Sequence, residues 1–256
     1  MNKLFWHLVL SILCVTAATV FAGTVGGIPA GVAAAIADPR RPAEQTSHDA
    51  ARKPAQMIAF AGVSSGDKVA DFMPGNAYFT RILSAVVGSS GHVYAFIPTE
   101  QVKNCPPREF AGTEAIAHDP GYGNVTVVTR SVADFRIPKK LDVLWTAQNY
   151  HDLHDSFMGP ADVAALDKAF FNALKPGGVF LVIDHVAESG SGLRDTESLH
   201  RIDPASIQRE IEAAGFVLEA QSDVLRNARD DHTLAVFDPV VRGQTDQVVF
   251  RFRKPL

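Results

Sequence analysis

The stretch from Val69 to Thr80, VADFMPGNAYFT, constrains the fold of this chain more than any other. A short apolar run ends at Asp71, and a Pro-Gly turn at Pro74 and Gly75 follows it. An apolar pattern with helical spacing begins directly after the turn. A strand, a tight glycine turn and a helix N-terminus together form the device with which α/β proteins hold nucleotide-like ligands. The sequence therefore predicts an α/β fold with a ligand site at the end of this strand.

Composition narrows the function classes. The 256 residues are 46% hydrophobic and 20% charged, which is ordinary for a globular domain with one core. The net charge of −4 leaves no basic excess, so we expect no nucleic-acid partner. Only Cys105 lies outside the N-terminal apolar segment, so we expect no disulfide within the folded domain.

The N-terminus has the pattern of a secretory leader. Lys3 precedes an apolar run over residues 4–22, and small residues follow the run. We predict a signal peptide over 1–22 (with cleavage as late as residue 37 as an alternative), a linker over 23–48, and one domain over 49–256. An uncleaved anchor is the other alternative, because the run is almost long enough to span a bilayer. The predicted location is the periplasm, with no membrane association after the leader is cleaved.

Apolar runs and helical patterns alternate through the predicted domain. Strands are predicted at 68–72, 91–97, 124–130, 141–146, 179–184, 216–224 and 247–252, and helices at 50–61, 79–87, 106–117, 160–174 and 204–215. This alternation predicts a mostly parallel sheet with helices on both faces. The last two strands have little helix between them, which predicts an antiparallel pair at one edge.

Five segments, in order, resemble the motifs of class I S-adenosylmethionine-dependent methyltransferases. They are DFMPGNA at 71–77, HVYAF at 92–96, SVADF at 131–135, LDVLW at 141–145 and LKPGG at 174–178. The resemblance covers residues 50–256. With the leader and the NYHD segment at 149–152, it extends to a bacterial exported group of predicted methyltransferases. It implies a Rossmann-like class I methyltransferase fold with a seven-stranded sheet, S-adenosylmethionine as cofactor, and methyl transfer to a small-molecule substrate.

The resemblance also implies which residues hold the cofactor. Gly75 lets the backbone approach the cofactor closely, and Asp71 is placed to accept hydrogen bonds from its amino-acid part. Asp134 falls where relatives contact adenine, and Glu100 is the carboxylate nearest to the position that binds the ribose in relatives. The complete expected set is Asp71, Met73, Pro74, Gly75, Asn76, Tyr78, Thr80, Glu100 and Asp134.

Two positions differ from the pattern of the family. Ala77 stands where a further glycine is usual, and Ile97-Pro98 stands where an acidic residue usually binds the ribose. S-adenosylmethionine is made in the cytosol, whereas this chain is predicted to be exported. These points support an alternative to methyl transfer, a non-catalytic or degenerate methyltransferase-fold binding protein in the periplasm.

Polar side chains follow the strand predicted at 141–146, at the sheet edge where ligands bind in this fold. The resemblance implies that Asn149 and Tyr150 contact the methyl acceptor, as an Asn-aromatic pair does in amino-methylating relatives. His151, as a neutral imidazole, is a candidate general base, and Asp152 is placed to orient it.

A metal-assisted enzyme is a further alternative. His151 and His154 are three residues apart, and His185 ends the strand predicted at 179–184. Asp155 follows His154, and a mixed set of imidazole and carboxylate ligands favours zinc or iron over magnesium. Arg201 is a candidate clamp for a substrate carboxylate, with a surface capping segment as the alternative.

Overall fold

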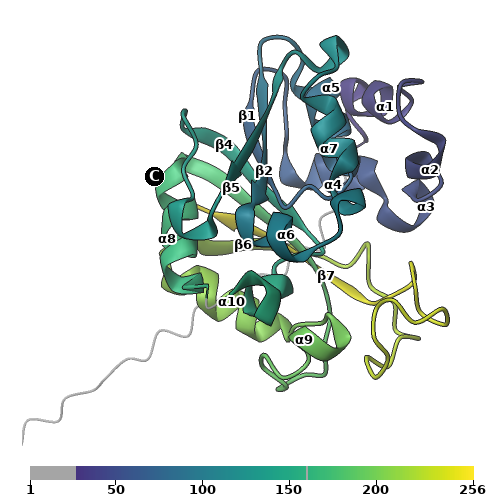
Figure 1. Cartoon of the computed structure of the whole chain (residues 1–256), viewed down its shortest axis with the longest axis vertical. Helices are drawn as coiled ribbons and strands as arrows, with labels where there is room; N and C mark the ends of the chain where they lie inside the picture. Colours follow the sequence, from purple (N-terminus) through teal and green to yellow (C-terminus); the bar gives the residue numbers. More distant parts are fainter. Residues whose placement is uncertain (1–26, 160) are drawn as a thin grey trace, which may run out of the picture.

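A computed structural model describes residues 27–159 and 161–256 of the chain. These residues form a seven-stranded sheet in the order β3-β2-β1-β4-β5-β7-β6, with helices on both faces (Figure 1). The strands are β1 Lys68–Phe72, β2 His92–Pro98, β3 Val125–Arg130, β4 Leu141–Ala147, β5 Leu174–His185, β6 Val217–Ser222 and β7 Gln247–Arg253. The longer helices are α1 Ala30–Ile36, α4 Pro54–Ala61, α5 Tyr78–Val87, α8 Val163–Ala173 and α10 Pro204–Ala213.

The strand pairing confirms the predicted topology. β1 pairs in parallel with β2 and β4, and β4 pairs in parallel with β5. β7 lies between β5 and β6 and is antiparallel to both. An antiparallel pair needs no helical crossover, which accounts for the scarcity of helix between β6 and β7.

Each face of the sheet has its own core. On one face, Phe170 of α8 and Ile207 of α10 pack on a cluster that includes Phe180. On the other face, helices α4 and α5 cover a cluster that includes Trp145 and Leu181. Strand β5 is buried from Gly178 to His185, which explains the almost continuous run of apolar residues that begins at Val179.

Two predicted helices are shorter or divided. The helix predicted at 50–61 consists of α3 Asp49–Arg52 and α4, separated at Lys53, whose φ is 43°. Pro54 causes the break, because a proline disfavours helical geometry in the preceding residue. The region predicted at 106–117 divides into a 3-10 turn at Pro107–Glu109 and helix α7 Ala111–Ile116.

The described part of the predicted linker is packed on the domain rather than extended. It contains α1 and a short helix α2 at Ala43–Thr46. Val32 and Ala35 are 2% and 4% exposed and belong to the core beneath α5. The Gly, Ala and Pro content favoured a linker, but alanine is also the best helix former, and this alanine-rich segment offers an apolar face.

The predicted signal peptide over 1–22 lies outside the described residues and stays a prediction. Within the described ranges, no helix combines the length and the hydrophobicity that a membrane crossing requires. Cleavage after residue 37 would remove α1 from the core, whereas cleavage after residue 22 would leave it in place.

The buried position of Val32 gives a test of this packing. Val32→Ala removes two buried methyl groups, so we expect it to lower the free energy of unfolding by about 1–3 kcal/mol. Urea denaturation measures the change. Val240→Ala is the matched control, since Val240 is 75% exposed and its truncation should have almost no effect. Equal stability of the two variants would contradict the packing of α1.

Candidate functional site

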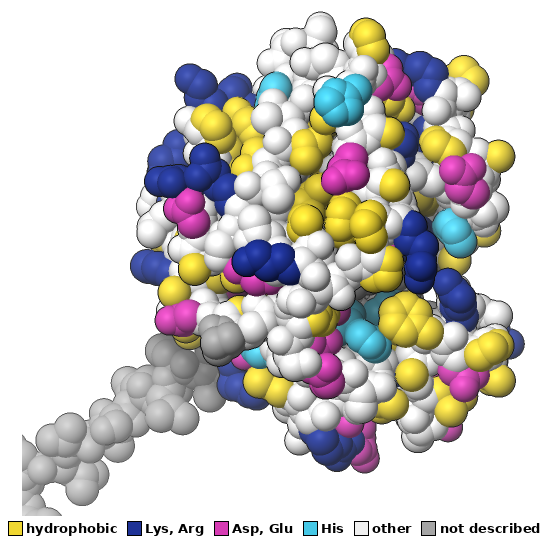
Figure 2. All heavy atoms as spheres, viewed as in Figure 1, with side chains coloured by type: hydrophobic (Ala, Val, Ile, Leu, Met, Phe, Trp, Pro, Cys, Tyr) yellow, Lys and Arg dark blue, Asp and Glu magenta, His cyan; other side chains and the backbone are white. Residues whose placement is uncertain are grey.

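A cavity of about 940 Å³ opens where β1 and β4 end. Its walls are the turn after β1, the loop after β4, residues from α2 and α3, and the segment between β2 and α7. Strand order reverses between β1 and β4, and open α/β sheets bind their ligands at such a switch point. The hollow is visible on the face shown in Figure 2, with histidine and hydrophobic side chains at its edge.

The turn after β1 repeatedly adopts left-handed backbone geometry. Met73, Gly75 and Ala77 have φ of 57°, 54° and 65°. Glycine adopts this geometry without strain, whereas a residue with a side chain does so at some cost. Ala77 is fully buried at the start of α5, outside the cavity wall. Alanine at this position therefore causes local backbone strain and does not narrow the cavity.

Neighbouring segments hold this turn in place. The Thr113 hydroxyl donates to the Gly75 carbonyl at 2.7 Å, and the Asn76 carboxamide exchanges hydrogen bonds with backbone groups of Arg108 and Gly112. A Cβ on Gly112 would lie 2.5 Å from the Asn76 carbonyl oxygen, so only glycine fits there. Gly75 and Asn76 line the cavity, as predicted. Hydrogen bonds with the segment 108–113 fix their backbone geometry.

Asp71 ends β1 at the floor of the cavity. It is 3% exposed, and its carboxylate accepts one side-chain hydrogen bond, from the Thr80 hydroxyl at 2.7 Å. Burial raises the pKa of Asp71 to about 7, although Thr80 and the charge of Arg52 act in the opposite direction. Thr80 is fully buried and does not line the cavity, so its contribution is to hold Asp71.

The sequence analysis missed Arg52, which also lines the cavity. Its guanidinium donates to the Gln148 side-chain oxygen at 3.1 Å and lies over the Tyr78 ring at 4.6 Å. Burial lowers the pKa of Arg52. Within residues 27–159 and 161–256, it forms no ion pair with a carboxylate. The Tyr78 hydroxyl donates to Asp49 at 2.6 Å, so the ring serves mainly as a support for this cation.

Two predicted cofactor contacts lie elsewhere. The Glu100 carboxylate accepts hydrogen bonds from the Ser131 hydroxyl and the Val132 amide, beside a separate and smaller cavity. Asp134 is at the surface, where it forms ion pairs with Arg130 and Arg136 at 3.0 Å. Short helix α6 Thr99–Asn104 starts directly after β2 and was not predicted, and it positions Glu100 away from the large cavity.

Of the predicted acceptor-binding pair, only Asn149 lines the cavity. Its side-chain NH₂ donates to the carbonyls of Met73 and Ala147 at 2.8 and 2.7 Å, which joins the loop after β4 to the turn after β1. Tyr150 is 1% exposed, and its hydroxyl donates to Asp167 at 2.8 Å on the side of the sheet covered by α8. The predicted stacking of Tyr150 on a substrate is therefore wrong.

His151 lines the cavity but is not suited to act as a general base. Its Nδ1 lies 2.8 Å from Asp184 and its Nε2 lies 3.1 Å from Asp152. Burial lowers the pKa of His151, but these two carboxylates outweigh burial and hold the pKa well above its ordinary value. A protonated imidazole cannot accept a proton, so the predicted base role is not supported. Asp152 does orient the ring, as predicted, together with Asp184.

The three histidines predicted as metal ligands do not come together. His154 lies 3.2 Å from Glu210, near Tyr150 and away from the cavity. His185 bonds the Thr245 hydroxyl at 2.7 Å, and burial lowers its pKa to about 3.

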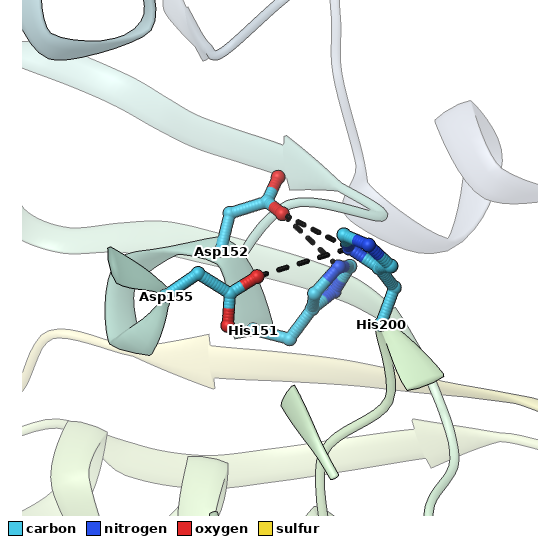
Figure 3. Close-up of side chains that lie close together, drawn as sticks. All are labelled: His151, Asp152, Asp155 and His200. Carbon is cyan, nitrogen blue, oxygen red and sulfur yellow. Dashed lines mark ion pairs between the residues drawn. The ribbon is translucent and has the colours of Figure 1, made fainter. Parts of the chain in front are cut away.

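A different group converges instead, which we call the His-Asp cluster. One potential ligand atom from each member lies within 4.8 Å of the others (Figure 3). Its members are His151, Asp152, Asp155 and His200. Sequence spacing pointed to the segment 151–155, but nothing in the sequence indicated that His200, after helix α9 Thr196–Leu199, would join it.

Arg201 is a structural residue rather than a substrate clamp. Its side chain is fully buried, and its guanidinium donates to both carboxylate oxygens of Asp230 at 2.9 and 3.0 Å. It also donates to the backbone carbonyls of Val186 and Leu234. These bonds attach the segment between β6 and β7 to the end of β5.

Comparison with known proteins supports the fold assignment. No family model matches the sequence, and the search of curated proteins found no similar sequence. Among solved structures, a SAM-dependent methyltransferase from Aquifex aeolicus has a TM-score of 0.54 at 16% identity, over 78% of this chain and 89% of that one. An S-adenosylmethionine-dependent methyltransferase from Mesorhizobium loti has a TM-score of 0.54 at 16% identity, over 79% and 97%. The cyclase SpnF has a TM-score of 0.56 at 17% identity, over 86% and 84%.

The pairing of the strands and these similarities agree. The chain has the Rossmann-like class I methyltransferase fold, with a mostly parallel seven-stranded sheet and a C-terminal antiparallel pair.

Proposed function

We propose that this protein binds S-adenosylmethionine and transfers its methyl group to a small-molecule acceptor. The observation that carries the proposal is the pair of opposite charges in the cavity, a buried carboxylate on Asp71 and a cation on Arg52 that has no carboxylate partner in the described part of the chain. The amino-acid part of S-adenosylmethionine carries one ammonium and one carboxylate, and it matches this pair.

The surroundings support the same assignment. The Asp71 carboxylate offers hydrogen-bond acceptors to an ammonium, and the Arg52 fork suits a carboxylate. Both groups line the same cavity as the left-handed turn at Met73 and Gly75, where backbone can approach a ligand closely. The SAM-dependent methyltransferases from Aquifex aeolicus and Mesorhizobium loti share the fold that presents this turn.

The size of the cavity leaves room for an acceptor. At about 940 Å³ it is near the upper end of the range for small-molecule sites, about 300–1,000 Å³. Asn149 and Gln148 line it beyond the turn. Methyl transfer is an in-line displacement, so the main task of the enzyme is to align the nucleophile with the methyl carbon and to exclude water. With His151 held as a cation, the proposal assigns no general base among the cluster residues.

Substitution of the two charges tests cofactor binding. We expect Asp71→Asn and Arg52→Gln each to weaken binding of S-adenosylhomocysteine about 10- to 100-fold, since a hydrogen bond to a charged group contributes about 1.5–3 kcal/mol. Isothermal titration calorimetry measures this loss. Asp134→Asn is the control, because Asp134 is at the surface and should leave the affinity unchanged. A folded wild-type protein that gives no binding heat would refute the proposal, and binding without turnover would favour the non-catalytic alternative.

The affinity should also depend on pH through Asp71. Its carboxyl has a pKa of about 7 in the free protein, and it must be ionised to bind an ammonium. Below pH 7 a proton must leave as the ligand binds, so the dissociation constant should rise by roughly tenfold per pH unit between about pH 7 and pH 5. Titrations in buffers across this range measure the slope. The dependence should disappear in Asp71→Asn, and an unchanged slope in that variant would assign the titration to another group.

We also propose that the protein is exported to the periplasm. The charged, apolar and small-residue order of residues 1–22 supports this location. Cleavage at residue 22 would keep α1 in the domain. Fractionation of the native protein, followed by N-terminal sequencing, should give a periplasmic chain that begins between residues 23 and 30. A cytosolic chain that retains residues 1–22 would contradict export.

A further inference from the structure

We propose that the His-Asp cluster binds one divalent transition-metal ion, and that zinc is the best match to its ligands. Two imidazoles and two carboxylates form a mixed nitrogen and oxygen set, which suits zinc better than magnesium or calcium. The proposal concerns a site at the edge of the cavity and does not depend on cofactor binding or methyl transfer.

The spacing of the ligand atoms fits a metal of this size. Asp152 Oδ1 lies 3.1 Å from His151 Nε2 and 3.8 Å from His200 Nδ1. His200 Nδ1 lies 3.7 Å from Asp155 Oδ2. In a tetrahedral zinc site with bonds of about 2.0–2.1 Å, neighbouring ligand atoms lie about 3.3 Å apart. Only small side-chain movements are needed to surround one ion.

The buried carboxylate of Asp155 is an independent indication that a cation binds in the His-Asp cluster. Its side chain is 1% exposed, and neither carboxylate oxygen has a hydrogen-bond partner within the described residues. Its one ion-pair contact in the described part of the chain is with His200 Nδ1 at 3.7 Å, and a buried carboxylate that accepts no hydrogen bond is destabilising. In Figure 3 the Asp155 carboxylate points toward His200, into the space between the members of the cluster. A bound cation would compensate this charge.

The second contact of His151 prepares the ring for a metal. Asp184 is fully buried and accepts from the His151 amide and ring Nδ1, both at 2.8 Å. His151 donates its Nδ1 proton to Asp184, and its Nε2 faces Asp152 in the cluster. A metal ion would displace the Nε2 proton that His151 carries in the free protein, because a ligand nitrogen must be deprotonated. Carboxylate-histidine-metal arrangements of this kind are the rule around protein-bound zinc. With four protein ligands the shell is complete, so the ion would tie the loop after β4 to the segment after α9.

Zinc titration of the full-length protein without a histidine tag tests the site. After chelator treatment and dialysis, we expect one equivalent of Zn²⁺ to bind by calorimetry and by elemental analysis. Asp155→Asn and His200→Gln should each weaken binding at least tenfold. Asp184→Asn should weaken it about 10- to 100-fold through the orientation of His151. His154→Gln is the matched control, since His154 comes from the same turn but lies outside the cluster, and it should bind zinc like the wild type.

Thermal unfolding separates a lost ligand from a damaged fold. Zinc should raise the melting temperature of the wild type by several degrees. Asp155→Asn should melt at or above the wild-type temperature in EDTA, because it removes a buried carboxylate that accepts no hydrogen bond, and zinc should not raise the melting temperature further. Absence of zinc binding by the wild type, or zinc binding that survives in both Asp155→Asn and His200→Gln, would overturn the proposal. Titration of S-adenosylhomocysteine into Asp155→Asn reports separately on the proposed function.

Discussion

The site depends on how the carbonyl groups of one strained turn are satisfied. The turn after β1 uses left-handed geometry at three positions, two of them without glycine. Its carbonyls are held by side chains from four segments: Asn149 bonds Met73, Thr113 bonds Gly75, and Gln45 and Arg81 bond Asn76. Strained backbone persists where surrounding contacts over-determine it. Most of these residues also line the cavity, so the contacts that fix the backbone of the turn also fix the shape of the cavity.

Two charged residues in the cavity, Asp71 and Arg52, indicate which ligand the site binds. Asp71 is buried and, within the described residues, accepts a single side-chain hydrogen bond, and Arg52 is held between Gln148 and the Tyr78 ring. Burial disfavours the charged form of both side chains and shifts their pKa values. Ligand-binding sites commonly contain groups whose pKa is perturbed in this way. The fold alone would not decide the reaction, since a cyclase shares it with methyltransferases. The assignment therefore rests on the charge pair.

Sequence patterns predicted the framework of the fold well, because alternation of strands and helices is a local signal. The seven strands, their mostly parallel pairing and the late antiparallel pair were all expected, whereas the order of the strands in the sheet was not, and Asp71, Gly75 and Asn149 were expected at the cavity. The errors share a physical cause. The partners of Tyr150, Arg201 and Glu100 come from distant segments, and a polar residue that is satisfied inside the protein has the same sequence signature as one that meets a ligand.

Arg52 and His200, which the sequence analysis missed, also reach the site through contacts between distant segments. Arg52 reaches the cavity because Pro54 ends α3 and redirects the chain, and His200 reaches the cluster because left-handed geometry ends α9 there, with φ of 52°. Neither position is marked by a motif. Residues 23–48 were predicted as a linker because they are rich in Gly, Ala and Pro, and only the buried side chains of α1 place the described part of this segment in the core.

A crystal structure of the complex with S-adenosylhomocysteine tests the central claim most directly. The account predicts that the ligand ammonium contacts the Asp71 carboxylate and that the ligand carboxylate contacts the Arg52 guanidinium, with the amino-acid part beside the turn after β1. A complex in which the amino-acid part lies away from both residues would contradict the account.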